Sequence, residues 1–385
     1  MTPEKSFLIR YWPQLTLTAV WVIMQAVLLY THGIVTVNEA GKYIEQADLL
    51  LDTGSVSHPS LWLYSTQILL IAAAKQLHTG YLSVVLVQLL FNALATWCLY
   101  KLCLQLSNRI TAFVCILLFI LNQPFQSFNT YLYTESLFYS FTILLSCYLL
   151  RLTKLTVQNF IVLVLFLLLI CFTRPSGLLF VPCTFLYLFF RFFQRLPFIV
   201  KTGLTLIVAV IFVCILNAVL GSGGELDFML PFREEHIICG VPALQDASIG
   251  QTPEEANSIR GIINYIFQHP GQFFRLAWLR TQAFFGLFRS YYSFTHNLYL
   301  GFYFFPVYLL VILCLKNWWH NNRSLLLYCI SIIIVTWGTV ILTCDDWHNR
   351  FFLVIVPYIY ILAIPALKKL TAKLQTDDSK PNLRS

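Results

Sequence analysis

The first residues that could do chemistry lie in a short polar segment, Val37–Tyr43, which follows the first apolar stretch. Glu39 and Tyr43 are four residues apart, so a helix would place both side chains on one face. We interpret Glu39 as a catalytic base and its neighbours Asn38 and Tyr43 as substrate-binding residues. The alternative is an ordinary solvated acid, because charged side chains in loops are usually hydrated.

Two further motifs carry charge at the ends of apolar segments. Glu135 stands in Tyr-Leu-Tyr-Thr-Glu-Ser-Leu-Phe. It either caps a helix or acts as a second catalytic acid that positions an acceptor substrate or orients a neighbouring side chain. Arg174 stands in Cys-Phe-Thr-Arg-Pro-Ser-Gly, between two short apolar runs. A guanidinium fork suits a lipid phosphate, and the alternative is an arginine that reaches outward to the lipid headgroups.

The last polar motif is Asp-Asp-Trp-His-Asn-Arg, residues 345–350, just before the final apolar segment. Asp346, His348 and Arg350 are candidate substrate-binding residues, with Arg350 the candidate for phosphate. Two acids and a histidine could also hold a divalent metal, but a hydrated loop is the simpler interpretation. We therefore predict neither a metal nor another cofactor.

A His-Pro pair opens an ambiguous segment, Ser57–Leu77, which is apolar but carries several polar residues. His58 is expected to cap and kink this segment, with acceptor binding as a secondary role. We predict a helix that lies in the outer membrane interface and does not span.

The composition indicates an integral membrane protein. Of 385 residues, 58% are hydrophobic and 11% are charged, and the mean hydropathy is +0.72, whereas soluble domains carry about 25% charged residues. Its immediate partners are therefore membrane lipids. The sequence has no Gly-x-Gly-x-x-Gly and no Walker loop, which argues against a nucleotide-linked donor, and we predict no nucleic-acid partner.

Charge distribution sets the expected topology. If Ser57–Leu77 does not span, the sequence predicts an all-α polytopic protein with ten transmembrane helices and both termini cytoplasmic. Sixteen of the 25 basic residues then lie inside, as the positive-inside rule requires. The expected spans are 12–30, 81–102, 110–128, 134–150, 157–173, 177–190, 202–220, 294–315, 324–343 and 351–367.

The chain is expected to form one domain, 1–385. A first external loop covers 31–77 and carries interfacial helices. A long external loop covers 221–293, with a helix start at Thr252 and amphipathic helices, and 368–385 forms a cytoplasmic tail. Cys239 and Cys344 fall in the predicted external loops and could form a bridge, whereas most other cysteines lie in apolar runs and are expected to pack as small hydrophobic residues.

Taken together, these motifs resemble the GT-C superfamily of integral-membrane glycosyltransferases. The resemblance rests on the acid with Tyr four residues on, His-Pro, Tyr-Thr-Glu-Ser-Leu-Phe, Thr-Arg-Pro-Ser-Gly and Asn-Arg-Phe-Phe…Pro, and covers about residues 1–190 and 345–367. The chain looks most similar to bacterial mannosyltransferases and aminoarabinose transferases that use lipid-phosphate sugars. Some motifs also resemble the GPI mannosyltransferase II (PIG-V) branch.

The resemblance implies a polyprenyl-phosphate-linked sugar as donor and a glycan, lipid or protein hydroxyl as acceptor, on the external face. It implies an inverting single displacement, with Glu39 as base, Glu135 and Tyr43 positioning substrates, and Arg174 and Arg350 at the phosphate. The alternative is a transporter or flippase of lipid-linked saccharides, although no internal repeat of the kind common in transporters is visible.

Overall fold

The fold is built from helices, as predicted. The computed structural model describes residues 3–221, 229–241, 257–289 and 291–377, and within these ranges it has no β-strand. The longer helices are α1 (Pro3–His32), α4 (Tyr81–Leu106), α5 (Arg109–Ile120), α7 (Glu135–Arg151), α8 (Val157–Thr173), α9 (Phe180–Phe192), α10 (Phe198–Gly221), α14 (Phe294–Asn321), α15 (Arg323–Leu342) and α16 (Arg350–Asp377). Between them lie α2 (Glu39–Thr53), η1 (Pro59–Tyr64), α3 (Ser65–Gln76), α6 (Gln123–Ser127), η2 (Phe128–Thr130), η3 (Pro175–Leu179), α11 (Leu230–Arg233), α12 (Ile259–Gln268), α13 (Pro270–Gly286) and η5 (Trp347–Asn349). The helix expected to start at Thr252 lies outside the described residues.

Seven helices in the described part of the chain are long and apolar enough to cross a membrane, or eight if one bent pair counts as a span. The bent pair is α5 with α6–η2, which meet at 60° where a single span, 110–128, was predicted. The bend follows from Asn122, whose side chain accepts a hydrogen bond from the backbone N–H of Phe125 and starts a new helix with Pro124 in its first turn. The count of ten spans stays a prediction.

The ambiguous segment Ser57–Leu77 does not form one long helix. It divides into the 3-10 turn η1 and the helix α3, which has 12 residues. A helix of that length rises about 18 Å, well short of the roughly 30 Å hydrocarbon core. It packs against α2, α4 and α8, which agrees with the prediction that this segment does not span.

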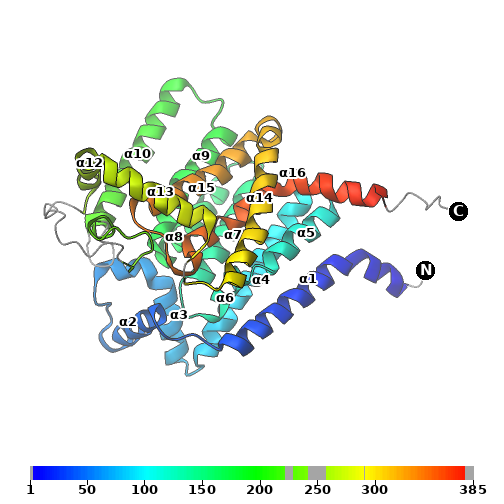
Figure 1. Cartoon of the computed structure of the whole chain (residues 1–385), viewed down its shortest axis with the longest axis horizontal. Helices are drawn as coiled ribbons and strands as arrows, with labels where there is room; N and C mark the ends of the chain where they lie inside the picture. Colours follow the sequence, from blue (N-terminus) through cyan, green and yellow to red (C-terminus); the bar gives the residue numbers. More distant parts are fainter. Residues whose placement is uncertain (1–2, 222–228, 242–256, 290, 378–385) are drawn as a thin grey trace.

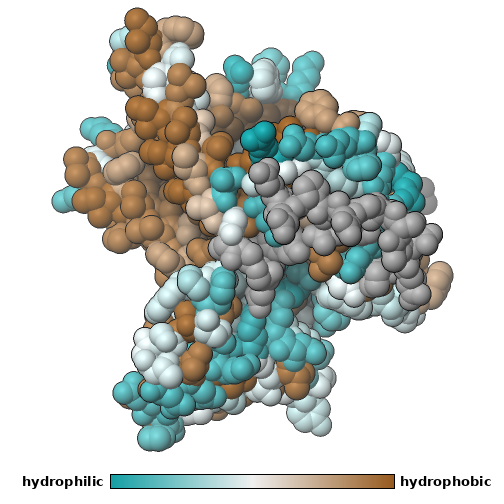
Figure 2. Space-filling view, turned by 90° about the vertical axis from the view of Figure 1, so that its left-hand side faces the viewer, coloured by the Kyte–Doolittle hydropathy of each residue, from teal (hydrophilic) through white to brown (hydrophobic). Residues whose placement is uncertain are grey.

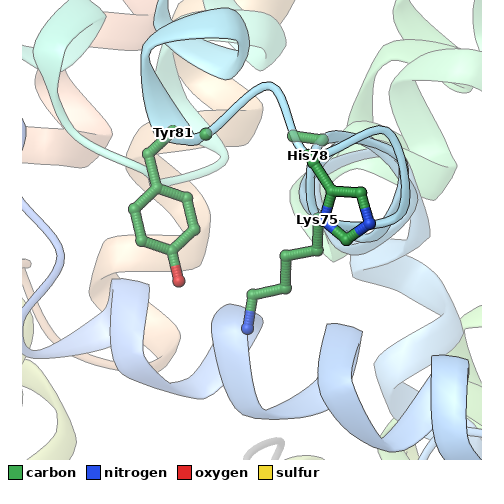
Figure 3. Close-up of a pocket in the computed structure, with 5 residues that line it drawn as sticks. Lys75, His78 and Tyr81 are labelled. Atoms are coloured by element: carbon green, nitrogen blue, oxygen red, sulfur yellow. The ribbon is translucent and has the colours of Figure 1, made fainter.

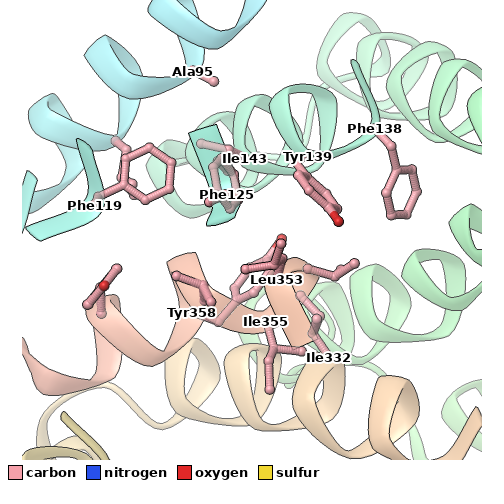
Figure 4. Close-up of a cluster of buried hydrophobic side chains, with 14 of the residues drawn as sticks. Ala95, Phe119, Phe125, Phe138, Tyr139, Ile143, Ile332, Leu353, Ile355 and Tyr358 are labelled. Atoms are coloured by element: carbon pink, nitrogen blue, oxygen red, sulfur yellow. The ribbon is translucent and has the colours of Figure 1, made fainter. Parts of the chain in front are cut away.

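The core is organised around α16. Every residue from Phe352 to Ile364 is buried, as expected for a helix that is apolar on all sides. This helix packs against α14, α15 and α5. In Figure 4, Leu353, Ile355 and Tyr358 of α16 lie between Tyr139 of α7 and Ile332 of α15, and the same cluster contains Phe119 and Phe125.

By contrast, α10 is apolar and largely exposed. Leu206, Ile207, Val210 and Ile211 are all more than half exposed, and the helix stands away from the bundle at the top of Figure 1. Figure 2 shows the corresponding upper region as hydrophobic, whereas hydrophilic residues gather lower down, where α2 and α3 lie. An exposed apolar surface of this kind suits contact with lipid.

The two terminal helices project from one end of the molecule, and the shorter helices α2, α3 and α12 lie at the other. In Figure 1 the first turns of α1 and the last turns of α16 project at the right, whereas α2, α3 and α12 lie at the left. Both terminal helices therefore leave the bundle on the same side, opposite the segments that carry α2 and α12. This arrangement is compatible with the prediction that both termini share one side of the membrane.

The predicted topology can be tested by labelling single introduced cysteines with a membrane-impermeant thiol reagent, in a background without the native reactive thiols. Asp52 and Lys154 are both exposed, and the predicted topology places them on opposite sides. We expect a cysteine at Asp52 to react from outside intact cells and one at Lys154 to react only after permeabilisation. Reaction of both from outside would show that the number of spans between them is even, contrary to the prediction.

Candidate functional site

A short backbone pairing brings the first two predicted site segments together. The backbone N–H of Val35 donates to Thr130 at 3.0 Å, and that of Leu132 donates to Val35 at 3.1 Å. These bonds hold the segment before α2 against the segment before α7. Glu39 and Glu135 are the first residues of those two helices, so a single arginine, Arg350, can contact both carboxylates.

A disulfide and a second backbone pairing fix the segment that precedes α16. Cys239 and Cys344 form a disulfide, which confirms the bridge that the sequence left open. Beside it, the backbone N–H of Cys239 donates to Asp345 and that of Asp345 donates to Ile237, both at 2.8 Å. The segment carrying Asp346 and Arg350 is therefore held at two successive residues, 344 and 345.

Glu135 is fully buried and lies between two arginines. Its Oε1 accepts a hydrogen bond from Nε of Arg350 at 2.6 Å and also pairs with Arg174. A buried carboxylate is costly unless it is paired and hydrogen-bonded, and here two cations from distant parts of the chain share it. Glu135 therefore sets the separation of the two guanidiniums.

The guanidinium of Arg350 also binds the carboxylate of Glu39 through two parallel hydrogen bonds. Nη1 donates to Oε1 at 2.8 Å and Nη2 donates to Oε2 at 2.6 Å, the fork geometry that arginine favours with carboxylates. The Tyr43 hydroxyl donates to Oε2 of Glu39 at 3.4 Å. The side chain of Glu39 is 36% exposed whereas that of Arg350 is 7% exposed, so Glu39 is the more accessible of the two side chains.

Asp346 completes what we call the charge cluster, which consists of Glu39, Glu135, Asp346, Arg174 and Arg350. Its Oδ2 lies 3.5 Å from Nη2 of Arg174 and 3.4 Å from Nε of Arg350. Three carboxyl groups thus surround two guanidiniums. The net charge of the cluster is therefore −1 when every group is ionised.

The environment of the cluster shifts the pKa values of its acids in opposite directions. Burial alone would raise the pKa of Glu39, but the charge and hydrogen bonds of Arg350, helped by Arg174 and Lys42, lower that pKa to about 2. Burial raises the pKa of Asp346, which the two arginines only partly oppose. Burial and the neighbouring carboxylates raise the pKa of Tyr43 well above 10, so its hydroxyl stays protonated and acts as a donor.

Each arginine is positioned by its local backbone. Arg174 sits between α8 and η3, where its own N–H donates to Ile170 and its carbonyl accepts from Gly177 at 2.8 Å. Arg350 begins α16, and its carbonyl accepts a hydrogen bond from the Tyr139 hydroxyl at 2.8 Å. The Arg-Pro-Ser-Gly turn and the buried α7–α16 contact are thus what place the two guanidiniums.

Three other predicted site residues are not in the cluster. Asn38 is exposed and has a left-handed φ of 58°, which asparagine tolerates better than most residues, so it sets the start of α2. His58 is exposed and its Nδ1 accepts from the backbone N–H of Ser60, which confirms its capping role. His348 is exposed and stacks against Tyr292.

Sequence reasoning missed two buried arginines as parts of the scaffold. Arg289 pairs with Asp345 next to the cluster, and both side chains are almost fully buried. Arg280 is fully buried and donates to the carbonyls of His236, Ile341 and Pro231. The available signal was their place in an aromatic, amphipathic stretch, where an arginine that faces the protein needs partners.

Within the described residues, the charge cluster coincides neither with a group arranged to hold a metal nor with the surface cavity beside α3. Among the residues that the structure describes, no three His, Cys, Asp or Glu side chains are arranged to hold a metal ion. A surface cavity of about 320 Å³ lies at the turn between α3 and α4, lined in part by Lys75, His78 and Tyr81 (Figure 3). Lys75 also pairs with Asp48 of α2 at 2.5 Å. No residue of the charge cluster lines this cavity.

No protein-family model, no curated protein and no solved structure matches this chain. The resemblance to GT-C glycosyltransferases therefore stays a prediction from the motifs. The function has to be argued from the geometry of the charge cluster.

The turn that positions Arg174 depends on Gly177. A Cβ atom at this position would lie 2.5 Å from the carbonyl oxygen of Ile170, so the backbone of η3 would have to move. We expect Gly177→Ala to destabilise the protein by about 1–3 kcal/mol, the usual cost of overpacking, measured as a lower midpoint of thermal unfolding in detergent.

Gly203→Ala is the matched control, because nothing lies within 4 Å of a Cβ at Gly203 in α10. Its midpoint should be unchanged or slightly higher, since alanine restricts the unfolded chain. Equal midpoints for both variants would show that the turn tolerates a side chain and that Gly177 does not fix Arg174.

Proposed function

We propose that this chain is a membrane glycosyltransferase of the GT-C type, which moves a sugar from a polyprenyl-phosphate donor to a hydroxyl acceptor. The acceptor is a glycan, a lipid or a protein of the cell envelope. The proposed location is the bacterial cytoplasmic membrane, with the reaction at the external face and both termini in the cytoplasm.

One observation carries the proposal. Arg174 and Arg350, which are far apart in the sequence, meet on the buried carboxylate of Glu135, and Arg350 also holds the partly exposed carboxylate of Glu39. A lipid-phosphate donor needs positive charge where its phosphate leaves, and the acceptor needs a nearby base. The charge cluster supplies both within one set of contacts.

In the proposed step, the acceptor hydroxyl oxygen attacks the anomeric carbon and forms the new glycosidic bond. The bond between that carbon and the phosphate oxygen breaks, and polyprenyl phosphate leaves with the electron pair. The hydroxyl proton passes to Glu39. A single displacement of this kind inverts the anomeric configuration, and Arg174 and Arg350 stabilise the charge on the departing phosphate.

The contact between Arg350 and Glu39 also suggests that the donor binds before Glu39 acts as a base. With its pKa lowered to about 2 by Arg350, Glu39 is a weak base, because an effective base has a pKa nearer the working pH. A donor phosphate that binds Arg350 would draw the guanidinium away from Glu39 and raise the pKa of that carboxylate. The base would then become effective only when the donor is in place.

The surroundings of the cluster fit a lipid-linked donor. The arginines lie at the ends of apolar helices, and Arg174 has the ring of Phe351 at 5.5 Å. The exposed apolar faces of neighbouring helices would keep a polyprenyl tail in the membrane while the phosphate reaches the cluster. A soluble nucleotide-linked sugar would gain nothing from these faces.

The test is turnover by purified protein in detergent, with a panel of polyprenyl-phosphate sugars and envelope acceptors. Glu39→Gln keeps the shape of the side chain but removes the proton acceptor, so release of polyprenyl phosphate should fall by about two orders of magnitude or more. Glu45→Gln, at an exposed position of the same helix, should leave turnover unchanged.

The same preparation separates the enzyme from a transporter. An enzyme consumes donor in detergent, where there is no membrane to cross. Transport of lipid-linked sugar by proteoliposomes without any release of polyprenyl phosphate in detergent would contradict the proposed function. Normal turnover by Glu39→Gln would remove Glu39 as the base.

A further inference from the structure

The loop that carries Asp346 and Arg350 also displays two aromatic side chains. Asp346, Asn349 and Arg350 are buried, whereas Trp347, at 40% exposure, and His348 between them are exposed. His348 and Asn349 both have a φ of 57°, a left-handed conformation that is uncommon for residues other than glycine. This double turn directs His348 outward and returns the chain inward at Arg350.

The tryptophan is held by a hydrogen bond at the edge of its ring, and 40% of the side chain stays exposed. Its Nε1 donates to the carbonyl of Cys239 at 2.9 Å, beside the Cys239–Cys344 disulfide. A large aromatic side chain on a fixed support is ordered before any ligand arrives, which lowers the entropy lost on binding.

A second segment adds more rings to the same place. The ring of Tyr291 lies 5.0 Å from that of Trp347, and Tyr292 stacks on His296 at 4.2 Å with an angle of 15° between the planes. Tyr292 also lies nearly parallel to His348, at 6.5 Å. We call these residues the aromatic shelf: Tyr291, Tyr292, His296, Trp347 and His348.

We infer that the aromatic shelf binds a saccharide ring of the acceptor, an inference that rests on the proposed transferase function. A cyclic sugar presents an apolar face of C–H groups and a rim of hydroxyls. The shelf presents aromatic faces with ring nitrogens and phenol groups at their edges, the mixture of apolar surface and a few polar groups that fixes ligand orientation. Tyrosine and tryptophan combine these two characters.

The position favours the acceptor over the donor. His348 is two residues from Arg350, whose guanidinium holds Glu39, and Glu39 is the open edge of the charge cluster. The donor phosphate is assigned to the buried arginines, so the group that approaches from the open edge is the acceptor. The shelf thus includes residues of the loop that leads into the arginine that holds the proposed base.

Exposed aromatic residues also occur where proteins meet lipid headgroups, and the chain offers a matched control for that role. Trp278 in α13 is 63% exposed and contributes no ring to the shelf. If Trp347 were part of the same interfacial belt, the two tryptophans would behave alike. The acceptor site requires them to differ.

The experiment is saturation-transfer NMR on the purified full chain in detergent, with methyl hexopyranosides as probes and acyclic sorbitol as the control. Transfer should reach the ring C–H protons of at least one hexopyranoside and not sorbitol. Trp347→Ala should weaken binding about three- to tenfold, the range that one aromatic contact supplies, whereas Trp347→Phe should recover part of it. Trp278→Ala should bind as the wild type does.

The outcomes are separable from those of the proposed function. Glu39→Gln should bind the saccharide normally while turnover is lost. A wild-type protein that binds the saccharide but never releases polyprenyl phosphate would contradict the transferase and leave the shelf in place. Absence of transfer to every hexopyranoside in the wild type would overturn the inference. So would unchanged binding in a folded Trp347→Ala variant, or equal effects of the Trp347 and Trp278 substitutions.

Discussion

The structure depends on one buried carboxylate that is shared by two arginines. Glu135 is fully buried, and Arg174 and Arg350 both contact its Oε1. Removing one partner of a buried ion pair typically costs about 3–5 kcal/mol, because the remaining charge is left without compensation. The segments before α7, after α8 and before α16 are therefore tied to one another by this contact, and the helices around them must pack so that it can form.

The proposed reaction would use the same groups that stabilise the fold. Without substrate, every guanidinium of the cluster has a carboxylate, and Glu39 is held by Arg350 through two hydrogen bonds. In the proposed reaction, a bound phosphate would take Arg350 as its partner and free Glu39, which also accepts a hydrogen bond from the Tyr43 hydroxyl.

Much of this could be predicted from residue types and their order. The apolar segments and the polar residues at their ends indicated an all-α membrane fold, and Glu39, Glu135, Arg174, Asp346 and Arg350 were all expected near a site. Their pairings could not be predicted, because they depend on short tertiary contacts such as Val35 with Tyr131, which leave no periodic pattern. The bend at Asn122 could not be predicted, because an apolar run does not show where a side-chain cap restarts a helix. His58 caps η1 and is not part of the charge cluster.

The central claim is that Glu39 and the donor phosphate compete for Arg350, and the most direct measurement is the affinity for polyprenyl phosphate. Binding to purified wild type and Glu39→Gln can be compared by native mass spectrometry at several lipid concentrations. If the carboxylate competes, Glu39→Gln should bind polyprenyl phosphate more tightly, by up to about tenfold for the release of one charge-assisted contact, although we expect the variant to lose turnover. Equal or weaker binding by folded Glu39→Gln would contradict the account, because Arg350 would then not be shared between the base and the phosphate.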